Sequence, residues 1–212
     1  MNLFKFRSAD NLDRILDIIL MRRLYCSDVK SFNDVREGDI RVGNDLGREI
    51  EIFEFGQTFS RAISEWRVCS LCKTFNNNLL WAHYADGFRG VAIDVDIPSP
   101  DVTSVTYSDD FVFLSDHIDE GVDAAVRSAL STKARMWQYE QEARLITREE
   151  FYNLTSPVQR LIVGPRIEQP VLRTLAEVCS EHGISIERAI IADWGVYTVG
   201  VQGVNSMSSE TP

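Results

Sequence analysis

The chain has 212 residues, and its 22 basic and 32 acidic side chains give a net charge of −10. A hydrophobic content of 44% with 25% charged residues is typical of a globular domain, which excludes the disordered, collagen and coiled-coil classes. The acidic balance argues against a surface that grips duplex phosphates by charge alone.

The first seventy residues predict two amphipathic helices between short strands. Asp10 is a good helix N-cap, and apolar side chains then recur at three- and four-residue spacing before Arg22 and Arg23 end the segment. A second apolar stripe leads from Ile52 to Trp66. We therefore expect strands at residues 3–7 and 24–27, helices at 10–23 and 48–66, and a polar loop at 31–47.

The remaining chain alternates between strand and helix patterns without the regularity of a doubly wound sheet. We expect strands at residues 68–71, 91–95, 103–107, 158–163 and 184–192, and helical segments at 79–85, 118–129 and 168–182. The pattern predicts one α+β domain over residues 1–200, with short, mostly antiparallel or mixed sheets and about four helices. Residues 201–212 are small and polar, and we expect a flexible tail there.

The N-terminal residues carry no pattern of a membrane span or an export signal. The apolar run at residues 15–20 is interrupted by Asp17 and is far shorter than a bilayer requires. Four cysteines without a secretion signal are expected to stay reduced, so we expect a cytoplasmic protein.

Cys69 and Cys72 form a Cys-x-x-Cys pair, which is open to a structural, a metal or a redox interpretation. A zinc site needs four ligands and the sequence has no second pair, while a redox cysteine belongs at a helix N-terminus rather than in a strand. We therefore expect buried structural cysteines and no metal.

Trp81, His83 and Tyr84 lie in a short segment that is rich in aromatic rings. Such a surface can stack a flat ring and hydrogen-bond to its edge. A helix packed on a sheet, with Trp81 and Tyr84 in the core, explains the same residues.

The segment from Lys133 to Arg144 concentrates charge and aromatic rings. As a strand it places Glu140, Glu142 and Arg144 on one face, where carboxylates must be paired, solvated or used in chemistry. As a helix it makes Glu140 and Arg144 an ordinary ion pair on a solvated face.

Several familiar signatures are missing from the sequence. It contains no Gly-x-Gly-x-x-Gly, no P-loop and no Gly-x-Ser-x-Gly nucleophile elbow. It also lacks a spaced set of His, Asp and Glu for a two-metal nuclease.

Taken together, these segments resemble a large bacterial family known as domain of unknown function 2971. The resemblance covers most of residues 1–167, and Val35 stands where that family usually has proline. The residues that carry it are Phe4–Arg7, Asn11, Leu12, Ile15, Leu16, Leu24, Tyr25, Ser27, Phe32, Asn33, Asp34, Ser70, Leu71, Trp81, His83, Tyr84, Ala85, Gly90, Val91, Lys133, Trp137, Glu140, Glu142, Arg144, Ile162, Val163 and Gly164.

The opening of the chain is also similar to ADP-ribosyltransferase domains of the DNA-modifying toxin type. In those folds a basic residue on the first strand and a Ser or Tyr on the second hold NAD, and a later Glu completes the site. Arg7, Ser27 (or Tyr25) and Glu142 (or Glu140) occur in that order here.

This resemblance implies an NAD-consuming enzyme, in a bacterial toxin or phage-defence context, with a split sheet. Glu142 would be catalytic and Glu140 would assist acceptor activation. NAD, as substrate, would contact Arg7, Tyr25, Ser27, Trp81, His83, Tyr84, Lys133, Trp137 and Arg144. The expected partner is a small-molecule nucleotide, with no membrane, and nucleic acid would enter only as a substrate to be modified.

Two rival functions remain open. A non-catalytic ligand- or partner-binding module would use the aromatic residues as a recognition pocket and the charged residues as a lock. A metal-independent nuclease would use His83. The loop at Phe32, Asn33 and Asp34 is either a turn or a substrate contact.

Overall fold

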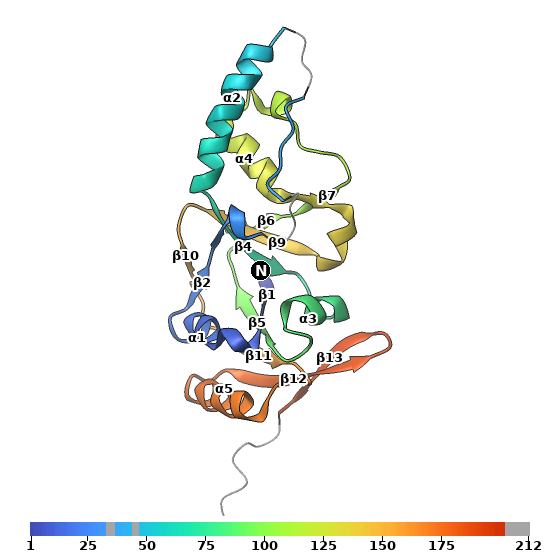
Figure 1. Ribbon diagram of the computed structural model, residues 1–212. Helices are drawn as coiled ribbons and strands as arrows, with labels where there is room; N and C mark the ends of the chain where they lie inside the picture. The colour runs from blue at the N-terminus through green and yellow to red at the C-terminus, as the bar shows by residue number, and fades with distance from the viewer. Residues whose placement is uncertain (33–36, 44–46, 202–212) are drawn as a thin grey trace, which may run out of the picture. The chain divides into compact units, whose positions relative to one another are not determined.

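The computed structural model describes residues 1–32, 37–43 and 47–201, and these residues form an α+β fold (Figure 1). The α-helices are α1 (Leu12–Leu20), α2 (Glu49–Ala62), α3 (Asn78–Tyr84), α4 (Val122–Ser131) and α5 (Gln169–Glu181). The strands are β1 (Asn2–Arg7), β2 (Arg23–Tyr25), β3 (Ser27–Asp28), β4 (Arg67–Cys72), β5 (Val91–Asp96), β6 (Thr103–Ser104), β7 (Thr106–Ser108), β8 (Thr132–Ala134), β9 (Glu142–Thr147), β10 (Phe151–Asn153), β11 (Arg160–Val163), β12 (Ser185–Ala192) and β13 (Gly195–Gly200). The predicted fold class, α+β, is confirmed.

The chain is organised as two compact units, and each is assembled from separate segments. Unit 1 comprises Met1–Arg23, Leu71–Ile97 and the chain from Asn153 onward, and unit 2 comprises Leu24–Ser70 and Pro98–Tyr152. The single domain over residues 1–200 stays a prediction, and all but the first residue of the predicted 201–212 tail lies outside the described residues.

Unit 1 is built on a mixed sheet with the strand order β13-β12-β11-β5-β1. The pairs are antiparallel except β11 with β12, which run parallel and are connected through α5. Figure 1 shows α5 lying along β12. The core includes Phe6 and Trp81, whose rings meet edge to face at 5.2 Å.

Unit 2 packs α2 and α4 together over short strand pairs (Figure 1). β3 pairs with β4 and β6 pairs with β9, both antiparallel, and β7 pairs with β8 in parallel. The core between the helices contains Ile52 and Phe59 from α2 and Val126 and Leu130 from α4. The helix predicted at residues 48–66 therefore exists, although its last turn is a tighter 3₁₀ turn at Ile63–Glu65.

Two predicted elements differ from the structure, and one strand was not predicted. The helix predicted from residue 118 begins at Val122, because Gly121 has a φ of +92° that no right-handed helix includes. The strand predicted at residues 24–27 is divided at Cys26 into β2 and β3. The sequence patterns predict no element at β13, although its Val, Tyr, Thr and Val favour a strand.

Candidate functional site

The backbone between Lys133 and Arg144 combines three conformations. Lys133 lies on β8, a 3₁₀ turn covers Arg135–Glu140, and β9 begins at Glu142. Between turn and strand, Gln141 has a φ of +45°, in the left-handed region that few non-glycine residues adopt. The strand interpretation is therefore right for Glu142 and Arg144 and wrong for Glu140, and the helix interpretation, with its solvated ion pair, is wrong.

Glu142 and Arg144 form a two-pronged ion pair on one face of β9. Arg144 Nε donates to Glu142 Oε1 at 2.7 Å, and Arg144 Nη2 donates to Oε2 at 3.0 Å. The remaining nitrogen, Nη1, donates to the backbone carbonyl of Leu130 at 2.7 Å. This planar, paired geometry is among the strongest that an arginine makes with a carboxylate.

Lys133 joins three carboxylates into one cluster. Its Nζ lies 2.6 Å from Glu140 Oε2, 3.1 Å from Glu142 Oε2 and 2.8 Å from Glu37 Oε1. Glu37 Oε1 also accepts from Arg144 Nη2 at 3.0 Å. We call these five residues, Glu37, Lys133, Glu140, Glu142 and Arg144, the charge cluster.

The charge cluster is shielded from water. The side chains of Lys133, Glu140 and Glu142 are each 3% exposed, and that of Arg144 is 0% exposed. Ions at this depth are tolerated only when partners replace their hydration. The contacts above supply such partners for both cations.

The pKa values of the cluster follow from these contacts. Burial raises the pKa of Glu142, but the charge and hydrogen bonds of Arg144, with smaller effects of Lys133 and Ser70, outweigh it and lower that pKa to about 2. Burial lowers the pKa of Lys133, but Glu142, Glu37 and Glu140 shift it well above its ordinary value. Both groups are therefore charged at neutral pH.

Two hydroxyl groups border the charge cluster. Ser70 on β4 is exposed and hydrogen-bonds to the carboxylate of Glu142. Tyr107 is half-buried, and its Oη accepts the backbone N–H of Glu142 at 2.7 Å. Burial, with the nearby charges of Glu142 and Glu140, raises the pKa of Tyr107 to about 12. The hydroxyl therefore keeps its proton at neutral pH.

A shallow hollow in unit 2, which we call the pocket, opens to solvent and has Lys133 in its lining; its volume of about 20 Å³ is enough for roughly one water molecule. Two carboxylates, two hydroxyl groups and one aromatic ring line it. These groups belong to Asp39, Asp110, Ser108, Thr132 and Phe111.

The other predicted contacts in unit 2 make ordinary structural interactions. The hydroxyl of Ser27 donates to the carbonyl of Val68 at 3.2 Å, and the ring of Tyr25 packs edge to face on Phe151 at 5.7 Å. Trp137 is half-buried, with Lys133 Nζ 5.1 Å from its ring centre. Of this group, only Trp137 is brought to the charge cluster.

Four predicted contacts, Arg7, Trp81, His83 and Tyr84, belong to unit 1. Arg7 ends β1 and is half-buried, opposite Val91 of β5. Trp81 is 0% exposed and its Nε1 donates to the carbonyl of Phe75 at 2.9 Å, so its ring is core. His83 is exposed and Tyr84 half-buried on α3. The nuclease role of His83 stays a prediction.

Sequence reasoning missed Glu37 and Tyr107 as members of this site and did not place Ser70 in it. Glu37 lies in the predicted polar loop, and no local pattern ties it to a lysine and an arginine about a hundred residues later. Asn33 and Asp34, also expected near substrate or in a turn, lie outside the described residues.

All four cysteines are buried and none forms a disulfide, and burial of Cys69 and Cys72 was expected. In residues 1–32, 37–43 and 47–201, no cluster of three or more His, Cys, Asp or Glu side chains has the geometry to hold a metal ion. The helices within these ranges include none that is both long and apolar enough to cross a membrane.

Comparison of the chain with protein-family models, curated proteins and solved structures found no match. The resemblances to domain of unknown function 2971 and to ADP-ribosyltransferases therefore stay predictions.

Proposed function

We propose that this protein is a non-catalytic partner-binding module, in which the charge cluster supports unit 2 and the adjacent pocket receives a cationic group of the partner. One observation carries the first part of this proposal. Both oxygens of Glu142 are already bound by Arg144, and Oε2 is also bound by Lys133. Glu142, the residue predicted to be catalytic, therefore already uses both of its carboxylate oxygens to bind Arg144 and Lys133.

The charge balance supports the same conclusion. A carboxylate that stabilises an oxocarbenium-like centre must bring uncompensated negative charge close to the reacting ribose. Glu142 faces a guanidinium and an ammonium at 2.7–3.1 Å, and these two cations, which Glu37 and Glu140 share, already engage both of its oxygens. Its pKa of about 2 also makes it a poor proton acceptor at neutral pH.

The pocket beside Lys133 has the chemistry of a cation site. Asp110 and Asp39 supply negative charge, although Arg41 already ion-pairs with Asp39 at 3.5 Å. Ser108 and Thr132 supply hydroxyl oxygens. Arg41 already lies over Phe111, with its guanidinium carbon 4.4 Å from the ring centre. A net charge of −10 attracts basic partners over longer distances. The pocket is too small to enclose an arginine side chain, so a guanidinium of a basic polypeptide would bind across its open mouth.

The test is a titration followed by NMR with N-acetyl-arginine amide, and with N-acetyl-citrulline amide as its neutral isostere. We expect shifts at the pocket with the arginine compound only, and at least tenfold weaker binding for Asp110→Asn. Asp109→Asn is the matched control, because Asp109 is adjacent in sequence but ion-pairs with Arg135 instead of lining the pocket. Equal binding of the two compounds would refute the cation site.

A second candidate is the NAD-consuming ADP-ribosyltransferase, and one observation favours it. Ser70 is an exposed residue and hydrogen-bonds to the Glu142 carboxylate, so this buried carboxylate contacts a residue that reaches the surface. Incubation of the purified protein with NAD would then release nicotinamide. Glu142→Gln should abolish the release while the melting temperature stays within a few degrees. Under our first proposal there is no release, and the same substitution destabilises the protein.

A further inference from the structure

The first two turns of α2 leave two large apolar side chains in solvent. Ile50 is 77% exposed and Phe53 is 66% exposed, whereas Ile52 and Phe59 on the other side of the helix are buried. That buried side packs on α4 (Figure 1) and on the 3₁₀ turn Leu114–His117. Single exposed apolar residues are common on protein surfaces, but two on one face of one helix are typical of an interaction surface.

Carboxylates border the exposed pair on both sides. Because each residue turns an α-helix by about 100°, Phe53 and Ile50 lie about 100° and 160° around the axis from the buried Ile52. Glu49 and Glu54 lie about 60° and 200° from the same residue. The order around α2 is therefore carboxylate, phenyl ring, isoleucine, carboxylate.

Both bordering carboxylates, Glu49 and Glu54, are exposed and form no ion pair with a described residue. The carboxylate of Glu49 accepts only backbone N–H groups, among them that of Gly47 at 3.2 Å. The third glutamate of α2, Glu51, pairs instead with Arg48 at 2.8 Å. Glu49 and Glu54 are thus available to cations from another molecule.

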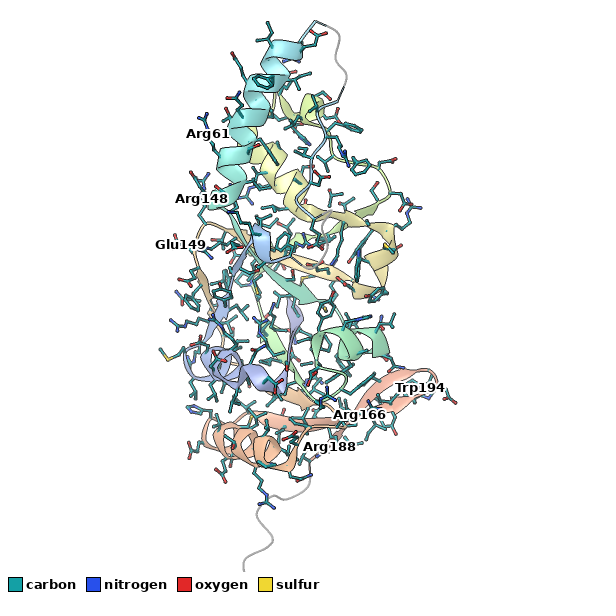
Figure 2. The ribbon with its side chains drawn as sticks, viewed as in Figure 1. Arg61, Arg148, Glu149, Arg166, Arg188 and Trp194 are labelled. Atoms are coloured by element: carbon teal, nitrogen blue, oxygen red, sulfur yellow. The ribbon has the colours of Figure 1, made fainter. Side chains whose placement is uncertain are left out.

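We propose that the first two turns of α2 bind a basic amphipathic helix of a partner protein. The apolar stripe of that helix covers Ile50 and Phe53, which lie three residues apart and form a ridge that packs into the groove of a second helix. Lysine or arginine side chains beside the stripe pair with Glu49 and Glu54. The contact ends before Arg61, the only cation on α2 (Figure 2). The inference rests on the proposed function, since it adds a second contact for a basic partner.

Charge selects this occupant over a second copy of the chain and over the chain's own terminus. A second copy carries a net charge of −10 and is repelled by an acidic surface. Residues 202–212 contain no lysine or arginine, so they supply no partner for the two carboxylates. A basic amphipathic helix meets both the apolar pair and the carboxylates. Added salt screens the ion pairs, so binding should weaken as ionic strength rises.

The test is a titration of the full chain against a labelled peptide of leucine and lysine, followed by fluorescence anisotropy. Its leucines recur at three- and four-residue spacing, so that the peptide forms an amphipathic helix. We expect saturable binding that weakens with salt, and no binding of the same peptide with glutamate in place of lysine. Phe53→Ser, and the double variant Glu49→Gln with Glu54→Gln, should each bind the lysine peptide at least tenfold more weakly.

The matched controls change similar residues outside this surface. Met21→Ser alters a side chain that is 60% exposed in unit 1, and the double variant Glu177→Gln with Glu181→Gln removes two exposed carboxylates from α5. Both controls should bind the peptide as the wild type does. The melting temperature shows whether each variant is folded, and Ile50→Ser takes the place of Phe53→Ser if the latter is not.

Three outcomes would overturn the proposal. One is a wild type that binds the lysine peptide no better than the glutamate peptide, and another is binding that survives the α2 variants. The third is a wild-type dimer in sedimentation velocity that Phe53→Ser abolishes, because the occupant is then a second copy. Phe53→Ser should still bind N-acetyl-arginine amide, and Asp110→Asn should still bind the peptide. Failure of this surface and failure of the cation site are therefore distinguished.

Discussion

Glu142 and Arg144 are two residues apart on β9, and the guanidinium of one holds both carboxylate oxygens of the other, at 2.7 and 3.0 Å. Neighbours at this spacing on a strand share a face, so the pair needs no long-range contact to form. The ion pair contributes to stability only where it is shielded from water, and the side chain of Arg144 is 0% exposed.

We expect Glu142→Gln to lower the free energy of unfolding by about 3–5 kcal/mol, because it removes the two-pronged carboxylate partner of the buried Arg144 and leaves only Glu37 to balance its charge. Chemical denaturation at pH 7 measures this loss. Glu149→Gln is the control: Glu149 is exposed in the turn after β9 and labelled in Figure 2. Its substitution should change stability by less than about 0.5 kcal/mol. Similar small losses for both variants would contradict a supporting role for the charge cluster.

We expect Lys133→Met to gain stability as the pH falls from 7 to 5. Without the ammonium, Glu37, Glu140 and Glu142 share only one buried cation, Arg144, so at least one carboxyl in the folded protein acquires a raised pKa. A carboxyl of raised pKa favours folding at low pH. The melting temperature of the variant should therefore rise from pH 7 to pH 5. A melting temperature of the variant that stays flat or falls between pH 7 and pH 5 would refute this expectation.

The wild type should lose stability in acid within a defined window. The folded pKa of Glu142 is about 2, against an ordinary value of 4.5 in the unfolded chain. The stability linked to this difference is complete above pH 4.5 and disappears as the pH falls toward 2. Urea denaturation between pH 6 and pH 2 measures it, and Glu142→Gln should show a flatter profile over the same range.

The wild type should also lose stability in strong alkali. The pKa of Tyr107 is raised to about 12 in the folded protein, against 10 in the unfolded chain. The folded state therefore retains a proton that the unfolded state releases, and stability falls as the pH rises from 10 to 12. Tyr107→Phe removes this contribution, and absorbance of the phenolate near 295 nm follows the ionisation directly.

We expect Gly90→Ala to cost about 1–3 kcal/mol, because the new Cβ would lie 2.0 Å from the carbonyl oxygen of Arg7. The backbone of β1 would have to shift where it pairs with β5. Gly200→Ala is the matched control, since its Cβ meets nothing within 4 Å. Thermal denaturation of both variants distinguishes a local clash from a general effect of replacing glycine.

Sequence patterns predicted the elements whose burial repeats locally. The stripe of Leu172, Leu175 and Cys179 predicted a helix, and α5 buries these three side chains. The alternation of Val91, Ile93 and Val95 with their neighbours predicted a strand, because a two-residue repeat is also local, and β5 is that strand. The charge cluster was only half predictable, because Glu37 reaches it across 107 residues and Glu140 depends on a left-handed turn at Gln141. A chain's local periodicity carries no information on either.

Unit 1 draws on three stretches of chain, and the last begins at Asn153. Its strands β11, β12 and β13 therefore leave the ribosome after all of unit 2 has been made. During synthesis β5 is made before its neighbour β11, so Val91 and Ile93 lack their cross-strand partners until β11 follows. A nascent chain arrested before residue 160 should consequently recruit chaperones that the finished protein no longer needs.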